Sequence, residues 1–420
     1  MPAERQITKT VDTVIGQKVV SGDWSIDTLW GENEAKSEGE VALGHFKDPI
    51  EGRLVARIPY ENLLGGMLIA GDTGYGKSEL RTTILLQAAI DGYGFCHIDT
   101  KAGCKDILER LPEHRLDDVV FLGSFDHKVV NGFDLLETNP HTEIEKGPAE
   151  TVADVLTAEE DSSPTHRQIA KSSTKLAIEL DTPFIKLSDV FTQNQDTADT
   201  DGLGPLAHEV LSMDPADEAI ESFEQRWSGF VESPQLRESI GNQNPISLYE
   251  AVQSGKIILV GAGGYPQEHR TQFAGALLRK LTEVFKTRDS DSDLFFLSID
   301  EIAQIPLSKY GLDDLFTKSR SWNVGLIPTI QYITQVDTDD KHLLMDNCPN
   351  LICFHQNDIN AANKFTSALN VDGRDELMKL KRYRVIGNLM AKHGNIEIKF
   401  ETFPPIEPLR NNVDYGAFEN

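Results

Sequence analysis

The fold of this chain is decided by one stretch, Gly71-Asp72-Thr73-Gly74-Tyr75-Gly76-Lys77-Ser78. It matches G-x-x-x-x-G-K-[ST], the pattern of a phosphate-binding loop. The apolar run at residues 67–70 is typical of a buried strand, and residues 79–90 carry apolar side chains at helical spacing. A glycine-rich turn with a chance Lys-Ser pair is the alternative, but the flanking strand and helix argue against it. The sequence therefore predicts a nucleoside triphosphate site.

Each residue type in this loop has a separate task in phosphate binding. Glycines let backbone N–H groups surround a β-phosphate, and the N-terminus of the following helix adds its positive dipole. We expect the Lys77 amine to contact the β- and γ-phosphates and the Ser78 hydroxyl to be a ligand of Mg²⁺. ATP and Mg²⁺ are therefore the expected cofactors, and the predicted nucleotide-binding residues are Gly71, Asp72, Thr73, Gly74, Tyr75, Gly76, Lys77, Ser78 and Glu79.

A second motif, Asp293-Leu-Phe-Phe-Leu-Ser-Ile-Asp-Glu301, has the pattern of a Walker B strand. Its apolar run predicts a buried strand that ends in two carboxylates. We expect Asp300 to hold Mg²⁺ through its water shell, and Glu301 to orient and deprotonate the attacking water. A single strand ending in Asp-Glu is common by chance. Together with the loop at 71–78, and separated from it by at least one further strand pattern, the motif predicts hydrolysis of the bound triphosphate.

Two further strand patterns end in polar residues that could reach the same site, because ligands of open α/β sheets bind at the carboxyl ends of strands. Asp99 and Lys101 end one of them, although a simple surface ion pair explains these two residues equally well. Gln331 ends the other and could contact the γ-phosphate or the attacking water. Arg320 precedes this strand and is a candidate arginine finger, since a guanidinium stabilises charge on a transferring phosphoryl group. An ordinary exposed helix arginine is the alternative.

The composition indicates a globular and strongly acidic protein. The chain has 420 residues, 39% of them hydrophobic, which is enough for a large core in two or three lobes. Its 67 acidic and 40 basic residues give a net charge of −27, which favours solubility and disfavours loose contact with polyanions. Acidic surfaces are also typical of proteins from a high-salt, halophilic cytosol. At molar salt the Debye length is roughly 3 Å, so the charge weakens a DNA-binding interpretation only modestly.

Cysteine spacing and hydropathy favour a cytoplasmic protein. The four cysteines form neither a C-x-x-C pair nor a zinc-ligand spacing. Cys96 and Cys353 lie within apolar, strand-like runs, so we expect buried, reduced thiols. No signal sequence is recognisable, and no apolar run approaches the ~20 residues that span a bilayer. We therefore expect no intrinsic membrane span, with attachment at the periphery of a membrane only through a partner.

Changes of pattern along the chain predict an interrupted α/β core. The segment between the two sets of strands is polar and acidic, with helical periodicity in patches and a disordered polar linker at 192–204. The five predicted parts are a polar N-terminal arm at 1–40, the first part of the core at 41–140, a mostly helical insertion domain at 141–248, the second part of the core at 249–403, and a C-terminal tail at 404–420.

The order of the motifs resembles the FtsK–HerA superfamily of ring ATPases, and within it the conjugative DNA coupling proteins of the TraG/TraD kind. The loop at 71–78 is similar to the superfamily's G-x-T-G-x-G-K-S. Residues 97–103 look like its D-P-K-G signature, with Thr100 in place of the proline and Ala102 inserted. Residues 130–136 look like the N-P-L segment that precedes a helical insertion.

The Walker B and sensor strands of the superfamily are matched at 299–301 and 329–331. Arg320 lies between them, where the superfamily places an arginine that acts on a neighbouring subunit. The resemblance covers about residues 41–400 and implies a RecA-like P-loop ATPase core, a mostly parallel sheet flanked by helices, with a mostly α-helical insertion. The residues it implies for catalysis are Lys77, Glu301, Arg320 and Gln331, and those for the metal are Ser78 and Asp300.

The resemblance also implies a function and partners. It implies a homo-oligomeric ring, a hexamer, that uses ATP to translocate DNA in conjugation or in viral genome packaging, with a membrane-anchored secretion protein or a virion protein as a further partner. A secretion-type ATPase that moves or remodels protein and a slow, nucleotide-switched scaffold remain open as alternatives. A basic cluster could meet DNA phosphates, although such clusters are more often solvated faces; it comprises Lys379, Lys381, Arg382 and Arg384.

Overall fold

The computed structural model describes ten stretches of the chain, which are 15–18, 39–48, 52–101, 104–125, 128–139, 147–158, 164–187, 217–240, 245–391 and 394–410. Nearly all of the expected N-terminal arm lies outside the described residues, as do the polar linker at 192–204 and the tail beyond residue 410. Within the described part of the chain, no helix is both long enough and apolar enough to cross a membrane.

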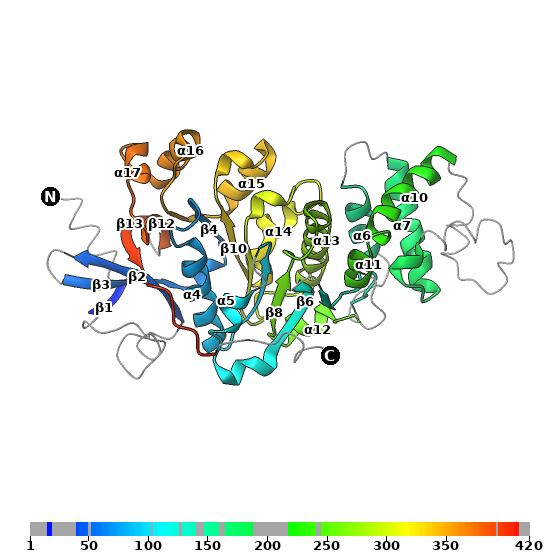
Figure 1. Cartoon of the computed structure of the whole chain (residues 1–420), viewed down its shortest axis with the longest axis horizontal. Helices are drawn as coiled ribbons and strands as arrows, with labels where there is room; N and C mark the ends of the chain where they lie inside the picture. Colours follow the sequence, from blue (N-terminus) through cyan, green and yellow to red (C-terminus); the bar gives the residue numbers. More distant parts are fainter. Residues whose placement is uncertain are drawn as a thin grey trace.

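The centre of the molecule is a mixed sheet, which has thirteen strands in the described residues (Figure 1). Their order is β1-β3-β2-β13-β12-β11-β4-β10-β9-β5-β8-β6-β7. The strands from β11 to β6 in this order pair in parallel, and antiparallel strands extend both edges. The bounds are β1 Ile15–Lys18, β2 Glu40–Asp48, β3 Gly52–Pro59, β4 Met67–Ala70, β5 Gly94–Asp99, β6 Val119–Phe125, β7 Lys128–Asn131, β8 Ile257–Gly261, β9 Phe295–Ile299, β10 Val324–Ile330, β11 Asn350–Cys353, β12 Arg384–Ala391 and β13 Gly394–Thr402.

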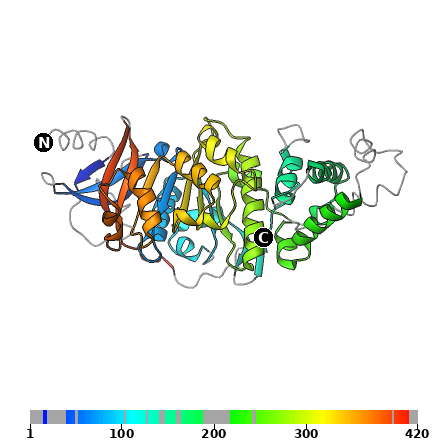
Figure 2. The same ribbon diagram turned by 90° about the horizontal axis from the view of Figure 1, so that it is seen from above.

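Helices cover both faces of the parallel part of the sheet, while others form one end of the elongated molecule (Figures 1 and 2). α7 and α10 lie at the end opposite the antiparallel strands β1, β2 and β3. The helix bounds are α3 Tyr60–Leu63, α4 Lys77–Ile90, α5 Lys105–Leu108, α6 Gly147–Leu156, α7 Pro164–Glu179, α10 Asp217–Val231, α11 Pro234–Ile240, α12 Leu248–Gln253, α13 Gln267–Phe285, α14 Asp313–Lys318, α15 Thr338–Asn347, α16 Ile359–Leu369 and α17 Arg374–Met378.

Alternate residues of the parallel strands belong to two separate apolar clusters, one on each face of the sheet. In β4, Met67 and Ile69 pack with α4, whereas Leu68 and Ala70 pack on the side of α13. Successive side chains of a strand point to opposite faces, so a strand that is buried on both faces reads as a continuous apolar run. This burial explains why the strands around the phosphate loop are uninterrupted apolar segments.

The expected strands are present, and the main differences lie at their ends. α4 begins at Lys77, two residues earlier than its apolar spacing predicts, because the polar end of the loop already forms its first turn. Residues 130–136, which resemble the N-P-L segment, start inside β7 and make a bridge from Phe133 to Ile246. Near the C-terminal end of the described chain, β12 and β13 pair as an antiparallel hairpin, and residues 359–369 form α16.

The segment between β7 and β8 is helical wherever the structure describes it. α6, α11 and α12 pack on α13, and their buried side chains belong to the same apolar cluster as the sheet. The helical character expected for this segment is therefore observed. Its independence as an insertion domain stays a prediction, because its inner helices share the core of the sheet.

Candidate active site

Five parallel strands carry the site at the end of the sheet where these strands finish, which we call its carboxyl edge (the opposite end is its amino edge). The carboxyl ends of β4, β5, β9, β10 and β11 meet at this edge, since the strands are parallel and in register. The phosphate-binding loop follows β4, and the two carboxylates of the Walker B motif follow β9. The sheet therefore brings together motifs that lie more than two hundred residues apart in the sequence.

The loop after β4 requires glycine where it passes β11. A Cβ at Gly71 would lie 2.5 Å from the Cβ of Phe354, which is closer than two carbons can approach. Gly71, Gly74 and Gly76 have φ values of +146°, +84° and +117°. Only glycine adopts such conformations at low cost. The backbone thus has the shape that a phosphate-wrapping loop needs, and a nucleoside triphosphate fits this part of the site.

The Lys77 amine lies over the loop that precedes it. Its Nζ donates to the carbonyl of Gly71 and, at 3.1 Å, to the carbonyl of Asp72. Burial lowers the pKa of Lys77, and the nearby charges of Glu301 and Asp300 oppose this effect. Ser78 is exposed in the first turn of α4. The Lys77 amine thus lies close enough to the Walker B carboxylates to feel their charges.

Two of the predicted loop residues anchor the loop to the segment after β11. The ring of Tyr75 stacks on the ring of His355, with centroids 4.3 Å apart and an angle of 7° between the planes. Oδ2 of Asp72 lies 3.1 Å from Nδ1 of His355 and accepts from the backbone N–H of Asn357 at 3.1 Å. Thr73 and Gly74 are exposed at the tip, and burial raises the pKa of Glu79 in the first turn of α4.

Asp300 is held as a carboxylate by two donors. Nη1 of Arg81 donates to its Oδ1 at 2.7 Å, and the hydroxyl of Thr329 donates to the same oxygen at 2.8 Å. Burial by itself would raise the pKa of Asp300, but the Arg81 charge and the Thr329 hydrogen bond outweigh it and lower this pKa to about 2. Asp300 is therefore ionised near neutral pH, as a ligand of Mg²⁺ or of its waters must be.

Glu301 is buried and fixed on both carboxylate oxygens. Nζ of Lys101 lies 2.9 Å from Oε2, and the backbone N–H of Gln331 donates to Oε1 at 3.1 Å. Glu301 itself has a left-handed backbone, with φ +50°, an uncommon state for a residue with a Cβ. Burial opposes protonation of Lys101, but its hydrogen bond to Glu301 and the charge of Asp300 prevail and raise its pKa.

Lys101 therefore belongs to the site, and its interpretation as part of a surface pair with Asp99 is wrong. The Asp99 carboxylate instead accepts the backbone N–H of Lys101 at 2.7 Å and that of Cys104 at 3.2 Å. His97, Asp99 and Cys104 bring potential metal-binding atoms within 4.8 Å of one another. The Asp99 oxygens accept hydrogen bonds from the backbone of Lys101 and Cys104, and burial raises the pKa of the Cys104 thiol. We therefore interpret the cluster as one that holds these two residues in place.

The two remaining predicted residues lie at opposite edges of the sheet. Gln331 directly follows β10 at the carboxyl edge, and its backbone contacts Glu301. Arg320 lies in the turn Ser319–Trp322 before β10, exposed at the amino edge. The seven residues of β10 separate the two edges by roughly 20 Å at ~3.3 Å per residue. Arg320 therefore cannot reach the phosphate loop of its own chain.

Arg81 and Thr329 belong to the site but are not predicted from the sequence, although their spacing from Lys77 and Gln331 is a weak indication. Arg81 follows Lys77 by four residues in α4, so the two side chains share one face of the helix. Thr329 precedes Gln331 by two residues, so both point to the same face of the strand. These spacings indicate only toward which side the two side chains point. Their hydrogen bonds to Asp300 depend on the order of the strands in the sheet.

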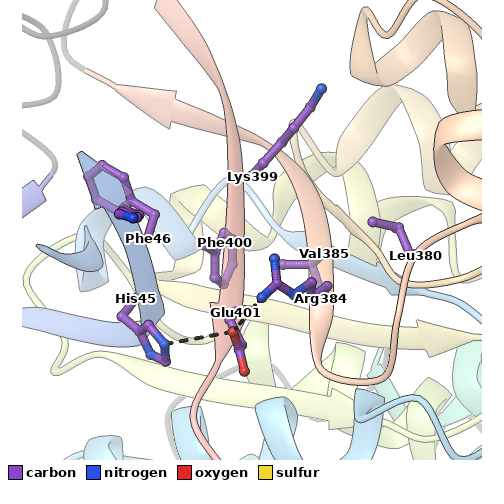
Figure 3. Close-up of a pocket in the computed structure, with 9 residues that line it drawn as sticks. His45, Phe46, Leu380, Arg384, Val385, Lys399, Phe400 and Glu401 are labelled. Carbon is purple, nitrogen blue, oxygen red and sulfur yellow. Dashed lines mark hydrogen bonds and ion pairs between the residues drawn. The ribbon is translucent and has the colours of Figure 1, made fainter. Parts of the chain in front are cut away.

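Two of the four members of the basic cluster near β12 are paired with acidic side chains. Lys379 pairs with Asp375 at 3.0 Å, and Arg384 pairs with Glu401 at 3.2 Å. Figure 3 shows Glu401 between Arg384 and His45 in a hollow of the antiparallel strands. These local partners favour the solvated-face interpretation over a strong phosphate-binding surface.

Comparisons with known proteins confirm the fold. No protein-family model matches the sequence, and no curated protein matches it. The plasmid coupling protein TrwB in complex with the non-hydrolysable ATP analogue ADPNP has a TM-score of 0.64 at 13% identity, over 85% of this chain and 89% of that one. TrwB in complex with ADP and Mg²⁺ gives 0.63 at 15% identity, over 84% and 89%. VirB4 of Thermoanaerobacter pseudethanolicus gives 0.59 at 14% identity, over 88% and 98%. The chain thus has the RecA-like P-loop ATPase fold that the resemblance implied.

Proposed function

We propose that this protein is an Mg²⁺-dependent ATPase that works as a ring motor and translocates DNA. The observation that carries the proposal is the meeting of the phosphate loop with an ionised Asp300 and a buried, doubly held Glu301. Similarity to the fold of a plasmid coupling protein supports DNA as the cargo. The acidic composition supports a working environment of high salt, in the cytoplasm of a halophile.

The residues of the site divide the work of hydrolysis between them. Lys77 and the loop amides bind the β- and γ-phosphates. When bound, Mg²⁺ would be held by Ser78 and Asp300 and would neutralise charge on the phosphate oxygens. Glu301 takes the proton of the attacking water, and Lys101 together with the Gln331 N–H keeps the carboxylate in one orientation.

Completion of the site requires a second subunit in this proposal. Arg320 is exposed at the far edge of the sheet, where it could reach the phosphates of a neighbouring chain in a ring. The proposed assembly is a homo-hexamer, with the helical segment between β7 and β8 free to contact a membrane-anchored secretion partner or a virion partner. Mixing Arg320→Ala with Glu301→Gln chains should restore activity, since each supplies what the other lacks. Mixed rings that remain inactive would contradict a finger acting in trans.

The decisive experiment is an ATPase assay in molar KCl with no DNA, single-stranded DNA or double-stranded DNA. We expect ATP hydrolysis that DNA stimulates severalfold and that Lys77→Ala abolishes. Activity without any stimulation would sink translocation and favour a protein-moving ATPase or a scaffold. A Glu301→Gln variant then separates these two, since a motor traps ATP and loses work while a scaffold keeps binding its partner. Undiminished hydrolysis by Lys77→Ala would refute the site itself.

A further inference from the structure

Tyr383 lies directly against the phosphate-binding loop. It immediately precedes β12, and its backbone N–H donates to the carbonyl of Tyr75 at 2.9 Å. A Cβ at Gly76 would lie 2.8 Å from Cδ1 of the Tyr383 ring, so the ring packs on the last glycine of the loop. The side chain is only partly buried. An aromatic surface is therefore accessible beside the loop.

The backbone fixes this ring in an unfavourable conformation. Tyr383 has φ +65°, in the left-handed region that residues with a Cβ rarely adopt. Its carbonyl accepts the backbone N–H of Thr402 at 2.8 Å, while its own N–H is bound to Tyr75. Strained residues that neighbouring segments hold in place are concentrated at ligand sites. Here the phosphate loop, the start of β12 and the end of β13 together determine where the ring lies.

A planar cation already lies on the ring. The Cζ of the Arg382 guanidinium is 4.7 Å from the centroid of Tyr383. A guanidinium and a nucleobase are both planar groups that stack on aromatic faces. Arg382 is exposed, and its charge acts on Glu79 in the first turn of α4. The pair therefore lies beside the helix that begins with Lys77 and Ser78.

The sheet order gives the direction of a bound triphosphate. Asp300 and Glu301 follow β9, which lies with β10 on one side of β4, whereas β11 and β12 lie on the other side. Since the terminal phosphate must face the carboxylates that act on it, the nucleoside end is directed toward β12. We propose that Tyr383 and Arg382 form the subsite for the nucleotide base. The base enters between the Tyr383 ring and the guanidinium that now lies on it, and the exposed Arg382 side chain moves outward to cover the base. This proposal rests on the proposed ATPase function.

Stacking predicts the kind of selectivity that the subsite has. Base–aromatic stacking is worth about 10-fold to 100-fold in affinity, and it tolerates every base because each has a π face. We therefore expect ATP and GTP to bind with similar affinity. Inorganic tripolyphosphate has no base, so its binding should depend on the loop and not on Tyr383.

The test measures binding of a non-hydrolysable ATP analogue and of tripolyphosphate, both with Mg²⁺, by isothermal titration calorimetry. Tyr383→Ala should weaken the ATP analogue about 10-fold to 100-fold and leave tripolyphosphate within about twofold. Tyr383→Phe should retain wild-type binding, because the ring remains. Arg382→Ala removes an exposed side chain without a backbone change and should weaken only the analogue, by about threefold to tenfold. Lys379→Ala is the matched control on the same segment and should change neither ligand.

Each other outcome has a distinct meaning. Unchanged binding of the analogue to Tyr383→Ala and Arg382→Ala overturns the base subsite. Equal weakening of the analogue and tripolyphosphate in Tyr383→Ala also overturns it, since the ring would then only support the loop. If wild-type protein binds neither ligand, the proposed ATPase function fails together with the subsite. If the wild-type protein binds both ligands and Lys77→Ala binds neither, the phosphate site is confirmed independently of the base subsite.

Discussion

The ion pair between Arg81 and Asp300 offers the sharpest test of how the site is built. The Arg81→Met variant keeps an apolar side chain of similar length and removes the charge that lies 2.7 Å from the carboxylate. Only 6% of the Arg81 side chain and 11% of the Asp300 side chain are exposed. The variant therefore leaves a buried carboxylate without its main partner, and we expect the folded state to lose stability.

The magnitude follows from burial and from the pKa of Asp300. Removing one partner of a buried pair costs about 3–5 kcal/mol. The change in this pKa from 3.8 to about 2 corresponds to roughly 2 kcal/mol, at ~1.4 kcal/mol per tenfold change. Because the pKa is lowered on folding, this contribution is present above about pH 4 and is lost as the pH falls toward 2. We expect the variant to be less stable by about 3 kcal/mol near neutral pH.

Urea denaturation near pH 7.5 and near pH 5 measures this cost. In Arg81→Met, burial without the guanidinium should raise the Asp300 pKa, so protonation relieves part of the cost at the lower pH. Asp300→Asn in the Arg81→Met background should recover much of the stability, because no unpaired charge remains. A cost below about 1 kcal/mol, the same cost at both pH values, or strictly additive effects would refute the reasoning.

Three further predictions concern Lys101 beside Glu301, the glycines of the loop, and the cysteines. Lys101→Met should lower kcat roughly tenfold with little change in ATP affinity, because Glu301 loses its orienting partner. Steady-state kinetics measures both values, and a change in KM alone would contradict an orienting role for Lys101. Gly76→Ala should destabilise the loop by about 1–3 kcal/mol and weaken ATP binding, since the new Cβ would meet the Tyr383 ring at a residue with positive φ. In Gly74→Ala the new Cβ meets nothing within 4 Å, so this variant should cost less. Calorimetry and thermal unfolding compare the two variants. All four cysteines are buried, and burial raises the pKa of each thiol. The native protein should therefore react with an aromatic disulfide reagent only after urea is added. Fast reaction of the folded protein would contradict this burial.

Much of the α/β core is predictable because local patterns determine it. The run Met67–Ala70 is apolar throughout since both faces of β4 are buried, and 71–78 must turn sharply since its glycines adopt positive φ. Element ends are less predictable. α4 starts inside the motif at Lys77, because the polar end of the loop already forms its first turn. β7 extends to Asn131, because its pairing with β6, which the local sequence does not encode, sets that limit.

By itself, the sequence determines that a phosphate loop and a strand ending in Asp300 and Glu301 exist, because both depend on residues close together in the chain. The tertiary structure decides which side chains serve them. Arg81, Lys101 and Tyr383 reach the site only because the sheet places α4, β5, β9 and β12 around β4. It also decides that Arg320 lies at the amino edge of the sheet, since the whole of β10 runs between Arg320 and the site at the carboxyl edge. Strand order is a property of long-range pairing, which no local pattern in the chain encodes.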